Sequence, residues 1–156
     1  MYRTTIKEWR ALLELKDVLP ATRGLIMDNG LAVEHPIRSG TVRWVDRENF
    51  AWVYNLMQSY AREAQEALGI DRVISIQDKI QLSTYYPGDH YDWHRDARVM
   101  SCSVLLSNNF TGGRLEFKEG GPLLKREGHA VFFPDVLHRV RPVLEGTRDS
   151  LVVWWK

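Results

Sequence analysis

Three residues of metal-binding types stand out by their spacing: His94 and Asp96, separated by Arg95, and His138 further along the chain. In an extended strand alternate side chains point to the same face, so His94 and Asp96 can reach one ion together while Arg95 points away. His138 then supplies a third ligand. Two neutral imidazoles and one carboxylate form the facial triad that leaves coordination positions open for non-haem Fe(II) and oxygen chemistry.

Other interpretations of the His-Arg-Asp step are weaker. A protein-kinase catalytic loop begins with the same letters but needs an Asn five positions after the Asp, where this chain has Ser101. A structural zinc site favours several cysteine ligands, and Cys102 is the only cysteine in the sequence. A solvated charged loop is the commonest origin of an isolated H-x-D step, so the surrounding sequence has to decide.

Short strand-like segments separated by turn residues surround these ligands. The segments 99–106, 114–117, 130–134 and 150–155 are rich in β-forming residues, and glycine or asparagine pairs lie between several of them. Short strands at regular spacing, punctuated by glycine, favour a sandwich or a jelly roll.

Residues from about 43 to the C-terminus resemble the Fe(II)/2-oxoglutarate-dependent dioxygenases, particularly the prolyl 4-hydroxylase-like group that includes the PKHD-type hydroxylases. Four motifs carry the resemblance, in the order and spacing of that family. They are Y-x-x-G-x-x-Y-x-x-H-x-D from Tyr85 to Asp96, S-x-S-V-L-L-S at 101–107, F-T-G-G-R-L-E-F at 110–117, and F-F-P-D-x-x-H-R-V-x-P-V-x-x-G-T-R-x-S-L at 132–151.

The resemblance implies a mainly β fold with flanking α-helices: a double-stranded β-helix, the cupin-like jelly roll, with N-terminal helices packed on one sheet. We expect one domain over residues 1–156, with a helical and loop part at 1–75 and the jelly-roll core with the metal site at 76–156. The resemblance also implies Fe(II), 2-oxoglutarate and O2, with ascorbate as a further candidate cofactor. His94, Asp96 and His138 would be the catalytic, metal-binding residues.

Arg148 is the candidate for binding the far carboxylate of 2-oxoglutarate, and Ser150 can add a hydroxyl donor. If the chain turns near Glu145, cross-strand pairing places His138 opposite Val152, so that His138, Arg148 and Ser150 share one face. Arg148 then lies four residues along from the metal ligand, roughly 13 Å at strand rise. A diacid that chelates iron at one end fills this gap, and a guanidinium binds carboxylate bidentately. A surface charge at a hairpin tip is the alternative for Arg148.

Two tyrosines, Tyr85 and Tyr91, resemble positions where the family places tyrosines that line the cosubstrate site or the pocket, with ordinary sheet packing as the alternative. Arg148 follows His138 by ten positions, which matches the prolyl-hydroxylase-like pattern. The related nucleic-acid dealkylases carry a second arginine six residues after the first, where this chain has Trp154. We therefore expect no nucleic-acid substrate.

Part of the N-terminal segment is expected to be helical, because residues 46–68 carry an apolar stripe at helical spacing and end before Gly69. Residues 28–40 have the composition of a loop. In the family that the chain resembles, loops before the core strands border the substrate entrance. Arg38, Arg43 and Trp44 are therefore candidates for substrate contact, with a solvated loop as the alternative.

Length and composition limit the number of domains, the kinds of charged partner and the cellular location. With 156 residues and a formal net charge of +1, the chain suits one domain and lacks the field that would attract nucleic acid or an anionic membrane. A single cysteine excludes an internal disulfide, and residues 1–25 contain no apolar segment typical of a signal peptide or membrane span. We therefore expect a cytoplasmic enzyme and leave its oligomeric state open.

The resulting hypothesis is a dioxygenase that hydroxylates an unactivated C–H bond. By resemblance, its substrate is a prolyl or other side chain in a peptide or protein. Two alternatives stay open: a hydroxylase of a free amino acid or another small metabolite, with the same iron chemistry, and a noncatalytic jelly-roll binding module. The intact ligand set and Arg148 argue against the module.

Overall fold

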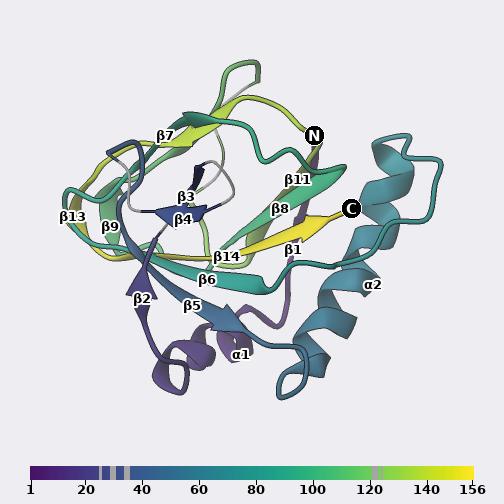
Figure 1. The fold of residues 1–156 in the computed structure, drawn as a ribbon, viewed down its shortest axis with the longest axis horizontal. Helices are drawn as coiled ribbons and strands as arrows, with labels where there is room; N and C mark the ends of the chain where they lie inside the picture. The colour runs from purple at the N-terminus through teal and green to yellow at the C-terminus, as the bar shows by residue number, and fades with distance from the viewer. Residues whose placement is uncertain (25, 29–30, 34–35, 121–122, 124) are drawn as a thin grey trace.

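The computed structural model describes residues 1–24, 26–28, 31–33, 36–120, 123 and 125–156. Its largest element is a seven-stranded antiparallel sheet with the strand order β1-β11-β8-β14-β6-β5-β2 (Figure 1). The strands of this sheet are β1 (Tyr2–Thr5), β2 (Thr22–Arg23), β5 (Thr41–Val45), β6 (Ile80–Tyr85), β8 (Met100–Leu105), β11 (His129–Phe133) and β14 (Arg148–Trp155).

Smaller sheets complete a jelly roll. One has the order β10-β12-β7 and another pairs β13 with β9, and Figure 1 shows β7, β9 and β13 together on one side of the large sheet. From β6 to β14 the chain passes repeatedly between the large sheet and the small ones, which confirms the predicted double-stranded β-helix. The strands of the small sheets are β7 (Tyr91–His94), β9 (Phe110–Gly112), β10 (Leu115–Phe117), β12 (His138–Val140) and β13 (Val143–Gly146), and β3 (Ile26–Asp28) pairs separately with β4 (Leu31–Val33).

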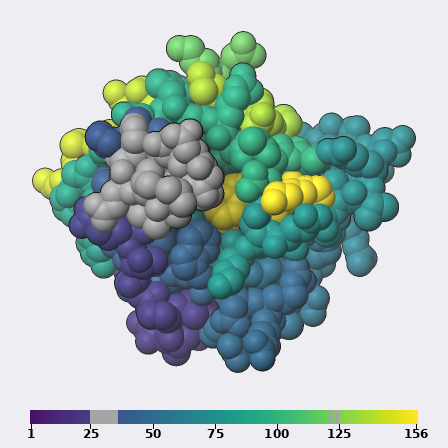
Figure 2. Space-filling view, viewed as in Figure 1, coloured from purple at the N-terminus to yellow at the C-terminus, as the bar shows by residue number. Residues whose placement is uncertain are grey.

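The helices lie on the outer side of the large sheet (Figure 1). They are α1 (Trp9–Glu14), followed by a 3-10 turn (Leu15–Asp17), and α2 (Ala51–Ala67). The blue-teal atoms of the α2 region form the right-hand margin of the molecule in the space-filling view (Figure 2). The apolar stripe predicted for α2 is confirmed, because its buried residues are Val53, Tyr54, Met57, Ala61 and Ala64. Among the described residues, no helix has the length and apolar character needed to cross a membrane.

The large sheet separates two apolar clusters because side chains alternate between the faces of each strand. Leu82, Leu151 and Val153 belong to the cluster on the outer face, which packs against the helices. Phe117 and Phe133 belong to the second cluster, between the large and small sheets. The outer cluster is the larger of the two, so most of the apolar burial lies away from the predicted metal ligands.

The N-terminal part contains more strand than predicted. The helical and loop assignment of residues 1–75 is wrong for β1, β2 and β5, since β1 and β2 form the two edges of the large sheet and β5 lies next to β2. Segment 41–45, T-V-R-W-V, has the β-branched residues and alternation of a strand. The loop predicted over 28–40 is also partly wrong, because β4 pairs with β3; its residues 29, 30, 34 and 35 lie outside the described residues.

The hairpin inferred between the strands of His138 and Arg148 is wrong. His138 pairs with His94 of β7, while Val152 pairs with Gln81 and Ser103. The two strands lie in different sheets, because the chain between them forms β13 against β9. Arg148 and Ser150 are nevertheless buried in the large sheet, where they pair with Tyr85 and Ser83 of β6.

Truncation of a side chain in the outer cluster should destabilise the fold strongly. Leu151 is fully buried, and we expect Leu151→Ala to lower the free energy of unfolding by about 2–5 kcal/mol. Leu144, which is 69% exposed on β13, provides the matched control, and Leu144→Ala should change stability by less than about 0.5 kcal/mol. Urea denaturation of both variants measures the difference, and equal losses would contradict the assigned packing.

Candidate metal centre and cosubstrate site

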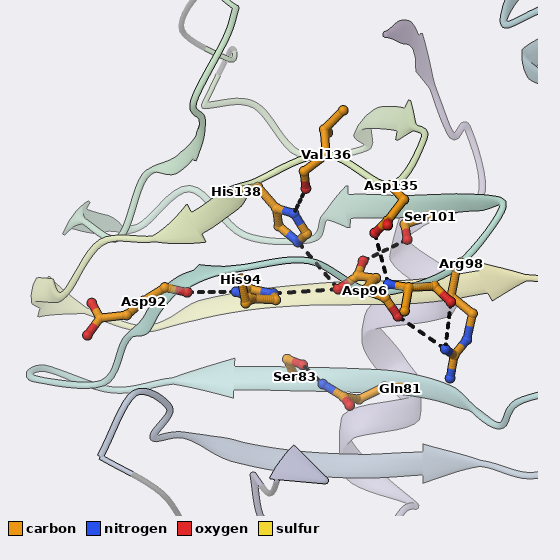
Figure 3. A network of polar contacts seen from close by, with 11 residues as sticks. Gln81, Ser83, Asp92, His94, Asp96, Arg98, Ser101, Asp135, Val136 and His138 are labelled. Atoms are coloured by element: carbon orange, nitrogen blue, oxygen red, sulfur yellow. Dashed lines mark hydrogen bonds and ion pairs between the residues drawn. The ribbon is translucent and has the colours of Figure 1, made fainter. Parts of the chain in front are cut away.

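The three predicted ligands converge between the large and small sheets (Figure 3). His94 ends β7 and His138 begins β12, and these two residues are direct cross-strand partners. Asp96 lies in the loop that follows β7. One ligand atom from each of the three residues lies within 4.8 Å of the other two, so the side chains can share a single cation.

Backbone carbonyls fix the tautomer of both imidazoles. His94 Nδ1 lies 2.7 Å from the Asp92 carbonyl oxygen, and His138 Nδ1 lies 2.8 Å from that of Val136. A carbonyl can only accept, so each Nδ1 donates its proton and each Nε2 carries the free lone pair. A neutral histidine that donates through one nitrogen and presents the other is the usual arrangement of a metal ligand.

Asp96 provides the third donor and is held from its far side. Its Oδ1 lies 3.5 Å from Nε2 of both histidines, and its Oδ2 accepts a hydrogen bond from Ser101 at 2.6 Å. Burial alone would raise the pKa of Asp96, but the neighbouring His138 and His94 and the hydrogen bond from Ser101 lower it well below the usual range. The carboxylate is therefore ionised and oriented toward the two imidazoles.

The loop that carries Asp96 is held by neighbouring side chains (Figure 3). Ala97 has a φ of +55°, a strained value for a residue with a side chain, and its N–H donates to Asp135 Oδ1 at 2.9 Å. Arg98 donates to the carbonyl oxygens of Asp96 and Ala97, while its Nε donates to Asp78 at 2.7 Å. These contacts set the direction in which the Asp96 carboxylate points.

Aromatic rings hold the imidazoles in place. The Tyr91 ring stacks on His94 with a centroid distance of 3.5 Å and an interplanar angle of 9°. Phe133 meets His138 edge to face at 4.8 Å, and Phe117 lies 5.9 Å from the same ring. The donor set fits a divalent metal such as Fe(II): two neutral nitrogens and one carboxylate, preoriented by packing and hydrogen bonds.

Arg148 is a buried cation that fits an anionic ligand. It is 4% exposed, its Nη1 donates to Ser150 Oγ at 3.1 Å, and no carboxylate among the described residues forms an ion pair with it. Burial lowers the pKa of Arg148, although a guanidinium remains charged in proteins. A cavity of about 600 Å³ lies beside Arg148, and Arg114, Lys125 and Arg141 also line it. A buried charge of this kind is favourable once an anion pairs with it.

The remaining residues singled out from the sequence divide into two groups. Tyr85 is 4% exposed, and its ring centroid lies 6.0 Å from the Arg148 guanidinium carbon. Arg38 lies 4.8 Å above the Tyr91 ring, so it borders the same region. Arg43 lies away from this region. It pairs with Leu82, whose side chain lies on the outer face of the large sheet, and its Nε donates to the Leu19 carbonyl oxygen.

Several positioning residues were missed by the sequence analysis. Ser101 and Arg98 hold Asp96 and its backbone, yet neither belongs to a ligand pattern. Asp135 also has a supporting function, because its carboxylate accepts a hydrogen bond from the Ala97 N–H. The only sequence signal for Ser101 was its place at the start of a strand just after the H-x-D step.

Comparisons with known proteins agree with this geometry. Residues 80–156 match the family model described as the 2OG-Fe(II) oxygenase superfamily, while no curated protein matches the chain. The match covers all three candidate ligands and Arg148. The family implies Fe(II), 2-oxoglutarate and O2, the cofactors expected from the sequence. Ascorbate binding and a cytoplasmic location stay predictions.

Solved structures share the fold over nearly the whole chain. A viral collagen prolyl hydroxylase from Paramecium Bursaria Chlorella virus-1, in a 2OG complex, has 18% identity and a TM-score of 0.74, covering 99% of this chain and 94% of that one. A Pseudomonas putida prolyl-4-hydroxylase has 20% identity and a TM-score of 0.73, covering 99% and 91%. A Trichoplax adhaerens prolyl hydroxylase, in complex with a hypoxia inducible factor peptide fragment, has 17% identity and a TM-score of 0.75, covering 94% and 74%.

Loss of the Ser101 hydroxyl should weaken metal binding without removing a ligand. We expect Ser101→Ala to raise the metal dissociation constant about 10–100-fold, the usual effect of removing a group that orients a ligand. His94→Ala, which removes a ligand, should bind more weakly still. Anaerobic calorimetry with Fe(II) measures both constants. Ser59→Ala is the control, because Ser59 is exposed on α2; equal affinity of Ser101→Ala and wild type would argue against the orienting role.

Proposed function

We propose that this chain, whose residues 80–156 match the family model of the 2OG-Fe(II) oxygenase superfamily, hydroxylates an unactivated C–H bond of a prolyl or other side chain in a peptide or protein. The observation that carries the proposal is the convergence of His94, Asp96 and His138 on one point between the sheets. Their donor types and fixed tautomers fit the metal that this superfamily uses.

Bound Fe(II) and 2-oxoglutarate supply the oxidising chemistry, in which O2 and the cosubstrate yield succinate and CO2 and one oxygen atom enters the substrate C–H bond. The chain contributes position and charge. His94, Asp96 and His138 would hold the metal from one side and leave the other side for cosubstrate and O2. The stacked Tyr91 ring keeps His94 from rotating, and the Ser101 hydroxyl keeps Asp96 aimed at the metal.

Arg148 and Ser150 would bind the far carboxylate of the cosubstrate. Both are buried, and both lie on β14, on the face of the large sheet that also carries Tyr85 and Ser83. A bidentate guanidinium–carboxylate contact fixes the direction of a small diacid. The keto acid end would then remain available to the metal held by the three ligands.

The substrate class rests on two supporting observations. The likeness to prolyl hydroxylases covers nearly the whole chain at 17–20% identity, which supports a shared fold. In addition, Trp44 is 43% exposed on β5, which lies between β6 and the edge strand β2, and it pairs with Gln81 of β6. An exposed indole on this strand offers a surface on which the ring or backbone of a larger substrate can pack.

Product analysis tests this function. Wild-type chain loaded with Fe(II) and 2-oxoglutarate should release succinate, and proline-containing peptides should gain the mass of one oxygen atom. Oxygen insertion into free amino acids but not peptides would favour the small-molecule hydroxylase. If the wild-type chain releases no succinate with or without substrate, the enzymatic proposal fails and the noncatalytic module becomes the better interpretation.

Substitution of Arg148 should separate cosubstrate binding from metal binding. Loss of a charge-assisted bidentate contact costs about 2–3 kcal/mol, so Arg148→Ala should raise the 2-oxoglutarate concentration for half-maximal succinate release roughly a hundredfold. Its Fe(II) affinity should stay within a few-fold of wild type. Arg126→Ala is the control, because Arg126 is an exposed arginine outside the cavity lining. An unchanged 2-oxoglutarate requirement in Arg148→Ala would remove this arginine from the site.

A further inference from the structure

Gln81 carries a buried polar atom that the proposed chemistry does not use. This residue of β6 is 2% exposed, and its Nε2 donates to Ser83 Oγ at 2.5 Å. Its Oε1 is buried and has no hydrogen-bond partner among the described residues. Because an unpaired buried acceptor is unfavourable, a bound molecule that supplies a donor to this atom would be stabilised.

The place of Gln81 in the sheet puts this acceptor beside the site. Gln81 pairs with Val152, which lies between Ser150 and Trp154 on the same face of β14. Ser150 accepts the hydrogen bond from Arg148, and Trp154 pairs with Ser101, whose hydroxyl holds Asp96. Gln81 therefore lies level with the space between the Arg148 anchor and the metal ligands. Figure 3 shows Gln81 and Ser83 on the strand beneath the ligand cluster.

Gln81 Oε1 needs a hydrogen-bond donor, and the chemistry of the molecules that bind at the site limits which of them can supply one. Every polar atom of an ionised 2-oxoglutarate is an oxygen acceptor, so the cosubstrate cannot satisfy Gln81 Oε1. The amide nitrogen of Gln81 lies 2.5 Å from Ser83 Oγ, and in this orientation Oε1 is the carboxamide atom without a partner among the described residues. The molecule that is hydroxylated can supply such a donor. Trp44, the neighbour of Gln81 on β5, gives that molecule an apolar surface beside the acceptor.

We propose that Gln81 Oε1 accepts a hydrogen bond from an N–H group of the substrate that is hydroxylated. This inference rests on the proposed hydroxylase function and deepens it. The N–H group is either the backbone amide that follows the modified residue in a peptide or the ammonium group of a free amino acid. Gln81 thereby selects substrates that carry such a donor, and Ser83 acts as a positioning residue for the carboxamide.

A binding experiment without turnover tests the contact. The chain is loaded with 2-oxoglutarate and with Zn²⁺, which has no redox chemistry and so prevents turnover. Calorimetry then measures the binding of two proline-containing peptides. In one peptide an amide follows the proline; in the other an ester replaces that amide and removes the N–H. Wild type should bind the amide about tenfold more tightly than the ester, whereas Gln81→Met should bind both alike.

Two further comparisons identify the source of the donor and control for the substitution. L-Proline and N,N-dimethylproline form a second pair, and a tenfold preference there instead of in the peptide pair assigns the contact to a free amino acid. Gln77→Met is the matched control, because Gln77 also donates from Nε2 to a serine two residues away, Ser75, but is exposed. Gln77→Met should keep the wild-type preference. Gln81→Leu repeats the measurement if thermal unfolding shows that Gln81→Met is not folded.

Three results would overturn the inference. The first is a tenfold preference that survives in both Gln81 variants. The second is a wild-type chain that shows no preference in either probe pair. The third is a Gln81 variant whose affinity for 2-oxoglutarate falls while its substrate preference is unchanged, which would make the side chain a cosubstrate ligand. Failure of the hydroxylase function is seen separately, as the absence of succinate and oxygen insertion with the Fe(II)-loaded wild type.

Discussion

The site depends on one shared atom, Asp96 Oδ1, which lies 3.5 Å from Nε2 of both His94 and His138. Each of these groups is held from its far side, the imidazoles by backbone carbonyls and the carboxylate by Ser101. Buried polar groups are unfavourable unless they are paired. The lone pairs that remain point at a common position, so a cation there completes the arrangement that the surrounding hydrogen bonds prepare.

Strand alternation lets one sheet serve stability and chemistry at once. On β14, Leu151 and Val153 face the helices and are fully buried, while Arg148 and Ser150 face the interior of the jelly roll. The same alternation on β6 separates Leu82 from Gln81 and Ser83. Polar residues can therefore accumulate on the inner face without interrupting the apolar cluster on which the free energy of folding mainly depends.

The sequence was sufficient for features that depend on local spacing or on a family pattern, and insufficient for those that depend on strand partners. Contiguous sequence motifs contain the H-x-D step and the second histidine, and they match a family with a jelly-roll fold. These features were therefore predictable. The pairing of His138 with His94 was not, since it joins segments whose register is set by the whole small sheet. Arg43 was misplaced for a related reason: a shift of one residue moves a strand side chain to the opposite face.

The neighbours Arg148 and Asp149 show why the buried guanidinium is left available for a ligand. Adjacent residues on a strand point to opposite faces, so Asp149 cannot turn inward to pair with Arg148. Its carboxylate instead accepts a hydrogen bond from Thr84 at 2.7 Å and forms an ion pair with Lys16 at 3.1 Å. The positive charge of Arg148 thus stays inside the jelly roll, where its guanidinium donates a hydrogen bond to the Ser150 hydroxyl. A dicarboxylate that supplies the opposite charge would bind the folded state selectively, so cosubstrate binding and fold stability are linked at this residue.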